Sequence, residues 1–245
     1  MRRNEFAARV WSKLIAFEKR HTLLSPGRGV LAAVSGGPDS VCLAHWLSIQ
    51  GRKNNFTVAI LHVNHGLRGR AAERDADFVR ALGARLGLRV YVVHADVRAR
   101  ARKSGQGLEQ AGRQERYRAL ITRARRGRFN AVATGHQLDD QAETVLLHLL
   151  RGTSLEGLGG IPPVRALAPG IELIRPLLPL TRMEILTYLE IHGLDWREDK
   201  TNSDPKFTRN WVRRDVLPLL ESHAPGVKTR LSDIAAKVRA ATGRA

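Results

Sequence analysis

The sequence predicts an α/β fold: a doubly wound, mostly parallel five-stranded sheet with helices on both faces and C-terminal helices beyond it. The first observation is that five short apolar runs recur along the chain, each followed by a segment of helical periodicity. Continuously apolar runs of this length are typical of strands buried on both faces of a parallel sheet. The second is a glycine-rich turn directly after the first run, where folds of this class place a ligand site.

The expected elements alternate regularly along the chain. The five strands are expected at residues 30–34, 57–61, 90–93, 131–134 and 171–174. The helices between them are expected near residues 40–50, 72–87, 107–126 and 139–151. Two more helical patterns follow Thr181. Because ligands bind beyond the carboxyl ends of parallel strands, functional residues are expected just after each apolar run.

The chain is expected to divide into three parts. Residues 1–27 begin with apolar residues at helical spacing and are expected to form a helix packed on the domain. Residues 28–222 form the α/β domain, in which the Gly- and Pro-rich stretch 151–170 is expected to be a long surface excursion. Residues 223–245 are expected to hold a helix that leads away from the domain.

The chain is strongly basic, with 41 Lys and Arg against 23 Asp and Glu among 245 residues, which gives a net charge of +18. Residues 66–128 alone hold 17 basic and 6 acidic residues, including the runs RARARK (98–103) and RARRGR (123–128). A solvated basic face is one interpretation; a surface that binds the RNA backbone is the other. Nucleic acid is favoured over a membrane because no run of 18 apolar residues occurs.

The strongest motif is AVSGGPDS, between the first expected strand and the next helix. Two adjacent glycines allow a tight turn whose backbone N–H groups point at one centre, and the helix adds its positive N-terminus. This pattern predicts a cradle for phosphate or pyrophosphate. No Gly-Lys-Ser/Thr occurs in the chain, so the ordinary P-loop is excluded, and a lysine-free loop suits a reaction in which pyrophosphate leaves.

A second motif, GHQLDDQAET (135–144), follows the fourth expected strand. It is expected to place His136 at the strand end and Asp139 and Asp140 in the first turn of the next helix. A helix dipole favours carboxylates at that position, which is one explanation of their presence. The functional explanation is that one carboxylate helps to hold Mg²⁺ on nucleotide phosphates, while His136 donates to a developing charge on phosphate.

A third motif, HVNHGLRG (62–69), follows the second expected strand. The His-x-x-His pair has no Cys or acidic partner at ligand spacing, so zinc is not favoured. The motif is expected to be a loop that lines the nucleotide or RNA site, with Arg68 as a phosphate contact.

Six motifs in this order resemble a known family. AVSGGPDS is similar to the pyrophosphate loop of the N-type ATP pyrophosphatases, the PP-loop enzymes with an adenine nucleotide α-hydrolase-like fold. The two motifs that follow it, together with GLEQAGRQERY (107–117), RPLLPLTRMEI (175–185) and DKTNSDPKFTRNWVRRDVLPLLE (199–221), resemble the bacterial tRNA(Ile)-lysidine synthases. The resemblance covers about residues 28–222, which it identifies as a PP-loop ATP pyrophosphatase catalytic domain.

The resemblance implies a two-step ligation on the wobble cytidine of a tRNA(Ile) with a CAU anticodon. ATP, bound with Mg²⁺, adenylates the carbonyl oxygen at carbon 2 of the base, and pyrophosphate leaves. The amino group of free L-lysine then displaces AMP and yields lysidine. A cytoplasmic location follows from these substrates, and the oligomeric state stays open, with a homodimer among the possibilities.

The resemblance also implies roles for individual residues. The reacting centre is expected to hold Asp140, His136, Asp39 and Arg213, and Mg²⁺ is expected on Asp39 and Asp140. The residues expected to bind ATP are Ala33, Val34, Ser35, Gly36, Gly37, Pro38, Asp39, Ser40, His62, Gly135 and His136. The residues expected to face tRNA or substrate are Arg68, Glu109, Arg113, Arg116, Arg209, Asn210 and Arg213.

The family usually carries one or two further domains that grip the tRNA, whereas here 24 residues follow Glu221. We therefore expect the catalytic domain without those domains, and the 66–128 region as the candidate for RNA binding.

Two alternatives remain at this point. A tRNA thiolase of the same superfamily generally needs several cysteines, but Cys42 is the single cysteine, which also excludes a disulfide framework, a Cys-based zinc site and an iron–sulfur cluster and indicates a reducing compartment. A non-catalytic RNA-binding domain is the other alternative, and the intact SGGPDS and GHQLDD motifs argue against it.

Overall fold

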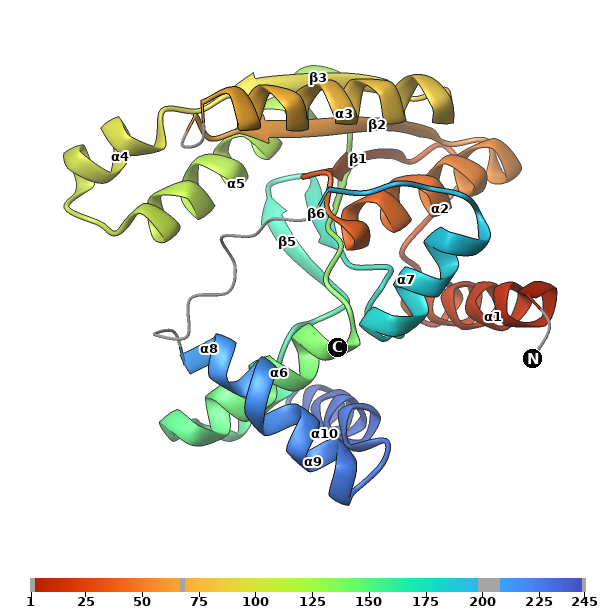
Figure 1. The fold of residues 1–245 in the computed structure, drawn as a ribbon, viewed down its shortest axis with the longest axis vertical. Helices are drawn as coiled ribbons and strands as arrows, with labels where there is room; N and C mark the ends of the chain where they lie inside the picture. Colours follow the sequence, from red (N-terminus) through yellow and green to blue (C-terminus); the bar gives the residue numbers. More distant parts are fainter. Residues whose placement is uncertain (1–2, 67–68, 198–207, 244–245) are drawn as a thin grey trace.

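A computed structural model describes residues 3–66, 69–197 and 208–243 of the chain. Its centre is a six-stranded sheet in the order β3-β2-β1-β4-β6-β5, drawn in Figure 1. Neighbouring strands pair in parallel except β5, which is antiparallel to β6. The strands are β1 (Gly29–Ala33), β2 (Thr57–Asn64), β3 (Arg89–His94), β4 (Ala131–Ala133), β5 (Val164–Ala168) and β6 (Ile171–Ile174).

The five predicted strands are confirmed, but the expectation of five strands in the sheet is wrong because β5 is a sixth. It lies inside the stretch 151–170, which also contains the short helix η1 (Leu155–Gly159). β5 forms an antiparallel hairpin with β6 through a turn in which Gly170 has a φ of +72°. As an edge strand it is only partly buried, so its residues lack the continuous apolar character that marks the central strands.

Helices cover both faces of the sheet, as a doubly wound fold requires. Alternation along β1 sends Val30 and Ala32 to one face and Leu31 to the other. The face of Val30 packs against α1 (Arg3–His21), α2 (Pro38–Asn54), α3 (Arg70–Leu86) and α7 (Arg182–Ile191). The face of Leu31 packs against α5 (Leu108–Gly127), beside which lies α4 (Val97–Ser104).

A separate group of helices lies beyond the sheet, at the bottom of Figure 1. It comprises α6 (Leu138–Arg151), α8 (Thr208–Trp211), the π-helical turn η3 (Val212–Val216), α9 (Leu217–His223) and α10 (Val227–Ala241). Leu147, Val212 and Leu217 belong to its small apolar core. The C-terminal helix α10, which was expected to lead away, lies along α6, and Arg239 donates a hydrogen bond to the Gly159 carbonyl. Among the described residues, no helix is long and apolar enough to cross a membrane.

The strand order changes direction between β1 and β4, and this point positions the site. From β1 the chain adds β2 and β3 on one side, and β4, β6 and β5 lie on the other. A crevice forms where neighbouring connections leave in opposite directions, and ligands bind there. The two strongest motifs follow β1 and β4, so the fold brings them together. A Cβ atom on Gly135 would lie 3.0 Å from the Asp39 carbonyl carbon, which shows how closely the segments approach.

The Gly135→Ala substitution is expected to lower the free energy of unfolding by about 1–3 kcal/mol, because the added methyl group meets backbone that cannot rotate away. Urea denaturation measures the change. Gly107→Ala is the matched control, since a Cβ there meets nothing within 4 Å. Equal stability of the two variants would contradict the close approach.

Candidate active site

The loop between β1 and α2 is held in a tight turn by its own side chains. The hydroxyl of Ser40 donates to the Gly37 carbonyl at 2.8 Å and accepts from the Gly36 amide at 3.1 Å. Gly36 has a φ of +98°, which favours glycine. Its carbonyl accepts from the Arg197 amide at 2.9 Å, so the segment after α7 lies against the loop.

The start of α2 is arranged to receive an anion. Gly37 is the N-cap residue and offers no side-chain oxygen, and Pro38 begins the helix. The first N–H groups of a helix have no acceptor within the helix, so a helix start without a capping side chain leaves donors for a ligand. Ser35 is exposed at the same turn, while Val34 and Ser40 are buried beneath it. The predicted phosphate loop therefore has suitable geometry.

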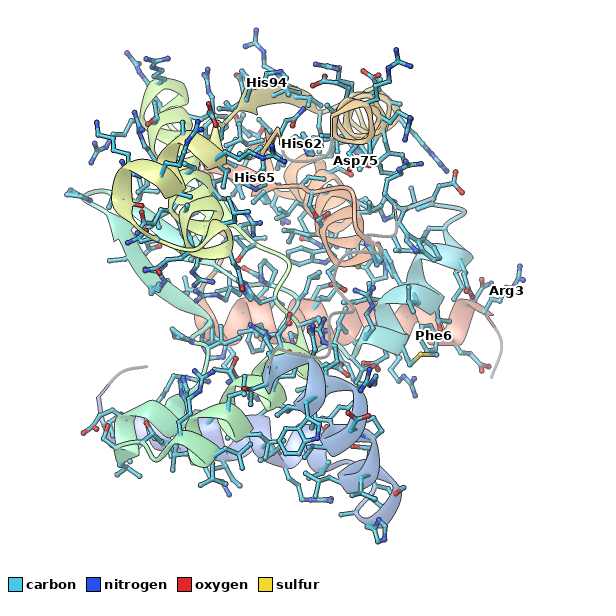
Figure 2. The ribbon with its side chains drawn as sticks, turned by 60° about the vertical axis from the view of Figure 1, so that its left-hand side comes forward. Arg3, Phe6, His62, His65, Asp75 and His94 are labelled. Atoms are coloured by element: carbon cyan, nitrogen blue, oxygen red, sulfur yellow. The ribbon has the colours of Figure 1, made fainter. Side chains whose placement is uncertain are left out.

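His62 supports this loop from below. Its side chain is buried, and its Nδ1 donates to the Val34 carbonyl at 2.9 Å. Burial lowers the pKa of His62, so the ring is neutral near pH 7. Figure 2 shows His62, His65, Asp75 and His94 gathered at the carboxyl ends of β2 and β3 beside α3. Within the described ranges, no three His, Cys, Asp or Glu side chains are placed to hold one metal ion.

Asp39, in the first turn of α2, has one oxygen paired and one unpaired. Its Oδ2 accepts from the Arg182 guanidinium at 2.7 Å, whereas Oδ1 is buried without a hydrogen-bond partner in the described part of the chain. Burial raises the pKa of Asp39 to about 6; Arg182 opposes this shift and the charge of Asp140 adds to it. An unpaired carboxylate oxygen fits Mg²⁺, which binds one or two carboxylates together with phosphate oxygens.

The start of α6 faces the loop from the β4 side. The side chain of Gln137 caps the helix, and the backbone amide of Gln137 donates to Oδ2 of Asp140 at 3.1 Å. Asp139 accepts from the Arg182 backbone amide and from Lys228, so it ties α6 to α7 and α10. Both oxygens of Asp139 are thus used in contacts between helices. In Asp140, by contrast, Oδ2 serves the helix cap and Oδ1 accepts only from arginine side chains.

A carboxylate that the sequence analysis did not single out completes this cluster. Glu143 is fully buried and accepts from Arg213 Nε at 2.5 Å and from Arg209 Nε at 2.8 Å. The same two guanidinium groups reach Oδ1 of Asp140, at 3.1 Å from Arg209 and 3.3 Å from Arg213. Glu143 lies three residues after Asp140 on α6. Residues at this spacing lie on the same helix face, so the sequence could have predicted that the two carboxylates are neighbours.

Around His136 the charge is positive. Nδ1 of His136 and Oγ1 of Thr134 are joined by a hydrogen bond of 2.9 Å. Burial, together with the charges of Arg175, Arg209, Arg113 and Arg116, lowers the pKa of His136 to about 3, so the ring is neutral at physiological pH. A neutral ring surrounded by guanidinium groups is suited to donate one hydrogen bond to an anionic ligand.

The remaining predicted residues lie on two helices. Glu109, Arg113 and Arg116 are exposed in the first half of α5, and Arg113 stacks 5.3 Å above the Tyr117 ring. Asn210 lies on α8 between the two arginines of the cluster. Arg68 and the stretch 198–207 lie outside the described residues. Two further cations were missed: Arg182, on Asp39, and Arg175, which is 4% exposed and donates to the Pro162 carbonyl.

The fold and this site define an α/β nucleotide-binding protein whose phosphate loop lies at the switch point of a parallel sheet. A family model described as "PP-loop domain" matches residues 8–220. The chain belongs to this PP-loop family, which supports ATP binding by the loop.

Curated relatives named tRNA(Ile)-lysidine synthase are similar to most of the chain. The relative from Clostridium perfringens (strain 13) is 40% identical over 211 residues, which cover 86% of this chain and 44% of that protein. The relative from Thermus thermophilus is 41% identical over 225 residues, covering 90% and 41%. The chain thus spans less than half the length of these relatives.

Two solved structures share the fold. The U34-tRNA thiolase NcsA from Methanococcus maripaludis with its [4Fe-4S] cluster superposes with a TM-score of 0.79 at 21% identity, over 96% of this chain and 79% of that one. The NH3-dependent NAD synthetase from Campylobacter jejuni superposes with a TM-score of 0.53 at 16% identity, over 97% and 95%.

Glu143→Gln is expected to lower the free energy of unfolding by about 1–3 kcal/mol. The change leaves two arginines without their buried counter-charge, and the effect stays below that of a fully buried pair because both arginines are about half exposed. Chemical denaturation measures it. The control is Asp215→Asn, which removes an exposed pair with Arg214 and should change stability by less than about 0.5 kcal/mol.

The pH dependence of Mg²⁺-ATP binding tests Asp39. Since the pKa of Asp39 is raised to about 6, the carboxylate that a cation requires is lost as the pH falls through 6, and affinity should drop about tenfold between pH 7 and pH 5. Calorimetry at both values measures this change. Asp39→Asn should bind weakly at both, whereas the exposed Asp233→Asn should retain the wild-type profile. A wild-type profile in Asp39→Asn would rule out this role.

Proposed function

We propose that this chain carries the catalytic centre of an ATP-dependent ligase that joins free L-lysine to carbon 2 of the wobble cytidine of a tRNA(Ile) with a CAU anticodon. The observation that carries the proposal is the placement of a lysine-free phosphate loop opposite a cluster of two carboxylates and two arginines, Asp140, Glu143, Arg209 and Arg213. The curated relatives with that name support the reaction.

The first step is adenylation of the base. The loop of Ser35 to Ser40 would hold the β- and γ-phosphates and Asp39 would hold Mg²⁺. The cytidine oxygen attacks the α-phosphate, and pyrophosphate leaves. Mg²⁺ supplies charge neutralisation on the phosphates when bound. The neutral ring of His136 donates a hydrogen bond to the α-phosphate when Thr134 donates to Nδ1, which leaves the proton on Nε2. Positioning and charge account for most of the catalysis.

The second step is attack by lysine on carbon 2, with AMP as the leaving group. An ammonium cannot attack, so the lysine must lose a proton. Asp140, whose side chain is 14% exposed, is the carboxylate that accepts this proton. Arg209 and Arg213 hold Asp140 in place and stabilise the negative charge on the departing AMP. The proton passes from the attacking nitrogen to this carboxylate and then to solvent.

A tRNA thiolase is the second candidate that the fold allows, because one solved structure of similar fold is a thiolase with a [4Fe-4S] cluster. Cys42 is the only cysteine here; it is fully buried, and burial raises the pKa of its thiol. A buried, protonated thiol carries neither a cluster nor sulfur transfer, so the ligase is favoured.

Incubation with unmodified tRNA(Ile), ATP and radiolabelled lysine tests the proposal directly. Label should enter the tRNA with release of one AMP and one pyrophosphate per lysine. A tRNA whose wobble cytidine is replaced by uridine is the control and should remain unlabelled. Binding of tRNA without any transfer would instead favour a non-catalytic RNA-binding domain.

Asp140→Asn should reduce lysine transfer by at least about 100-fold, because the neutral amide accepts no proton, while tRNA affinity stays close to wild type and the loss of stability is no larger than in Glu143→Gln. Single-turnover assays with labelled lysine measure the rate. The matched control is Asp77→Asn, an exposed carboxylate on α3 paired with Arg80. Wild-type transfer by Asp140→Asn would assign the proton acceptor to another group.

A further inference from the structure

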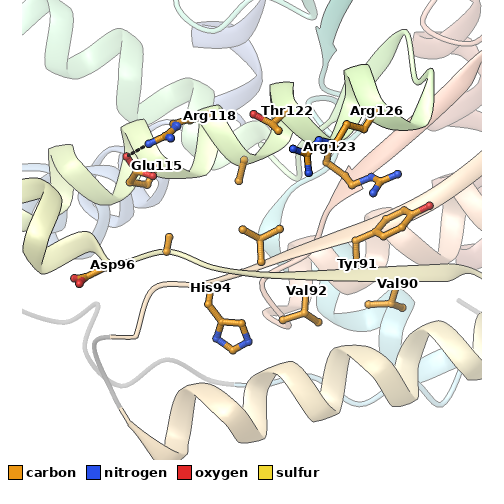
Figure 3. A pocket seen from close by; sticks show the side chains of 13 residues that line it. Val90, Tyr91, Val92, His94, Asp96, Glu115, Arg118, Thr122, Arg123 and Arg126 are labelled. Atoms are coloured by element: carbon orange, nitrogen blue, oxygen red, sulfur yellow. Dashed lines mark hydrogen bonds and ion pairs between the residues drawn. The ribbon is translucent and has the colours of Figure 1, made fainter.

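The cavity at the outer edge of the sheet is not used by the proposed chemistry. A groove of about 600 Å³ lies between β3 and α5. Figure 3 shows Arg118, Arg123 and Arg126 along its helical wall, with β3 as the opposite wall. β3 is an edge strand, so the groove runs along a strand with one unpaired side.

Three arginines, Arg118, Arg123 and Arg126, outnumber the two acids that line the groove. Glu115 lies 3.5 Å from both Arg100 and Arg118, and Asp96 caps α4 by accepting from the Ala99 amide. Arg126 is exposed and has no acidic partner among the described residues. The groove therefore presents net positive charge to whatever occupies it.

The unpaired side of β3 offers both donors and acceptors. Ala95 donates to Asn64 of β2, and backbone groups alternate sides along a strand. The amides and carbonyls of Val90, Val92 and His94 therefore point away from β2. Phosphate oxygens accept from amides and guanidinium groups, and ribose 2′-hydroxyls donate to carbonyls. DNA provides no such hydroxyl.

The groove also connects features that sequence charge alone left separate. Its end at Asp96 adjoins α4, which contains the basic run 98–103, and its other end lies beside the run 123–128 at the end of α5. The Asp96 end of the groove lies just after the carboxyl end of β3. The phosphate loop follows the carboxyl end of β1, so both lie at the same end of the parallel strands. One basic path thus leads from the catalytic edge along the side of the molecule.

We propose that the β3–α5 groove binds the sugar–phosphate backbone of the RNA substrate, at nucleotides away from the base that reacts. This inference rests on the proposed function for the identity of the RNA. An acidic extended peptide would also match an open strand edge, but a ligand with a negative charge on every residue and hydroxyl donors between the charges fits three arginines and alternating backbone groups better.

The double variant Arg118→Ala/Arg126→Ala tests the proposal. Its affinity for the tRNA(Ile) transcript, measured by fluorescence anisotropy, should fall about tenfold near 150 mM salt, and the slope of log K against log salt should decrease by about 1.5 to 2. The control is Arg20→Ala/Lys53→Ala, which removes two exposed charges elsewhere and should leave both quantities nearly unchanged. ATP binding should be unaffected in both.

A second variant tests the strand edge. Val92→Pro removes an outward-facing amide without removing a bond to β2, so RNA affinity should fall relative to Val92→Ala while circular dichroism and ATP binding stay the same. If the wild type transfers lysine to tRNA but Arg118→Ala/Arg126→Ala binds RNA with unchanged affinity, the proposal for the groove fails while the proposed function stands. Displacement of tRNA by a poly-glutamate peptide or by DNA of the same sequence as effectively as by RNA would also overturn the proposal for the groove. RNA binding that depends on the groove without lysine transfer would instead refute the proposed function.

Discussion

The proximity of two chain segments at the boundary between β1 and β4 is the constraint on which the rest of the site depends. Gly135, which follows β4, lies so close to the Asp39 backbone that a methyl group there would be 3.0 Å from the Asp39 carbonyl carbon. Because α2 and α6 both begin here, their positive N-termini face the same space. Asp39 belongs to one helix start and Asp140 to the other, so a relative shift of the two segments would separate the carboxylates and also move the loop that holds phosphate.

Charge is distributed around this boundary in three distinct ways. At α6, the carboxylates of Asp140 and Glu143 balance Arg209 and Arg213, which docks α8 and η3 on α6. At His136, the charges of nearby guanidinium groups and burial lower the pKa of the ring, and no acid is among the causes of the shift. This surplus of positive charge favours a phosphate group nearby. At Asp39, burial leaves a carboxylate that is incompletely paired and that a cation would complete. Neutral, positive and negative environments thus lie side by side, as phosphoryl transfer requires.

The sequence was sufficient for the features whose physical cause is local. The central strands could be predicted because burial on both faces makes them continuously apolar, and the phosphate loop because two glycines, a strand and a helix are adjacent in the chain. β5 could not, since an edge strand needs little apolar character. The contacts of Glu143 with Arg209 and Arg213 span 66 and 70 residues, and that of Arg182 with Asp39 spans 143, so only the folded chain brings them together.

Helix α5 runs from the neighbourhood of His136 to the groove and carries arginines along its length. Arg113 and Arg116, near its start, act on His136, whereas Arg123 and Arg126, near its end, line the groove. Arg116 and Arg123 are seven residues apart on α5, about 10 Å along the helix axis, so one element holds the two places at a fixed distance. If the groove binds RNA as proposed, the RNA would reach the carboxyl ends of the strands at a set number of nucleotides from the bound backbone. On the proposed RNA binding, the placement of the basic charge on one helix would determine which nucleotide reaches the site.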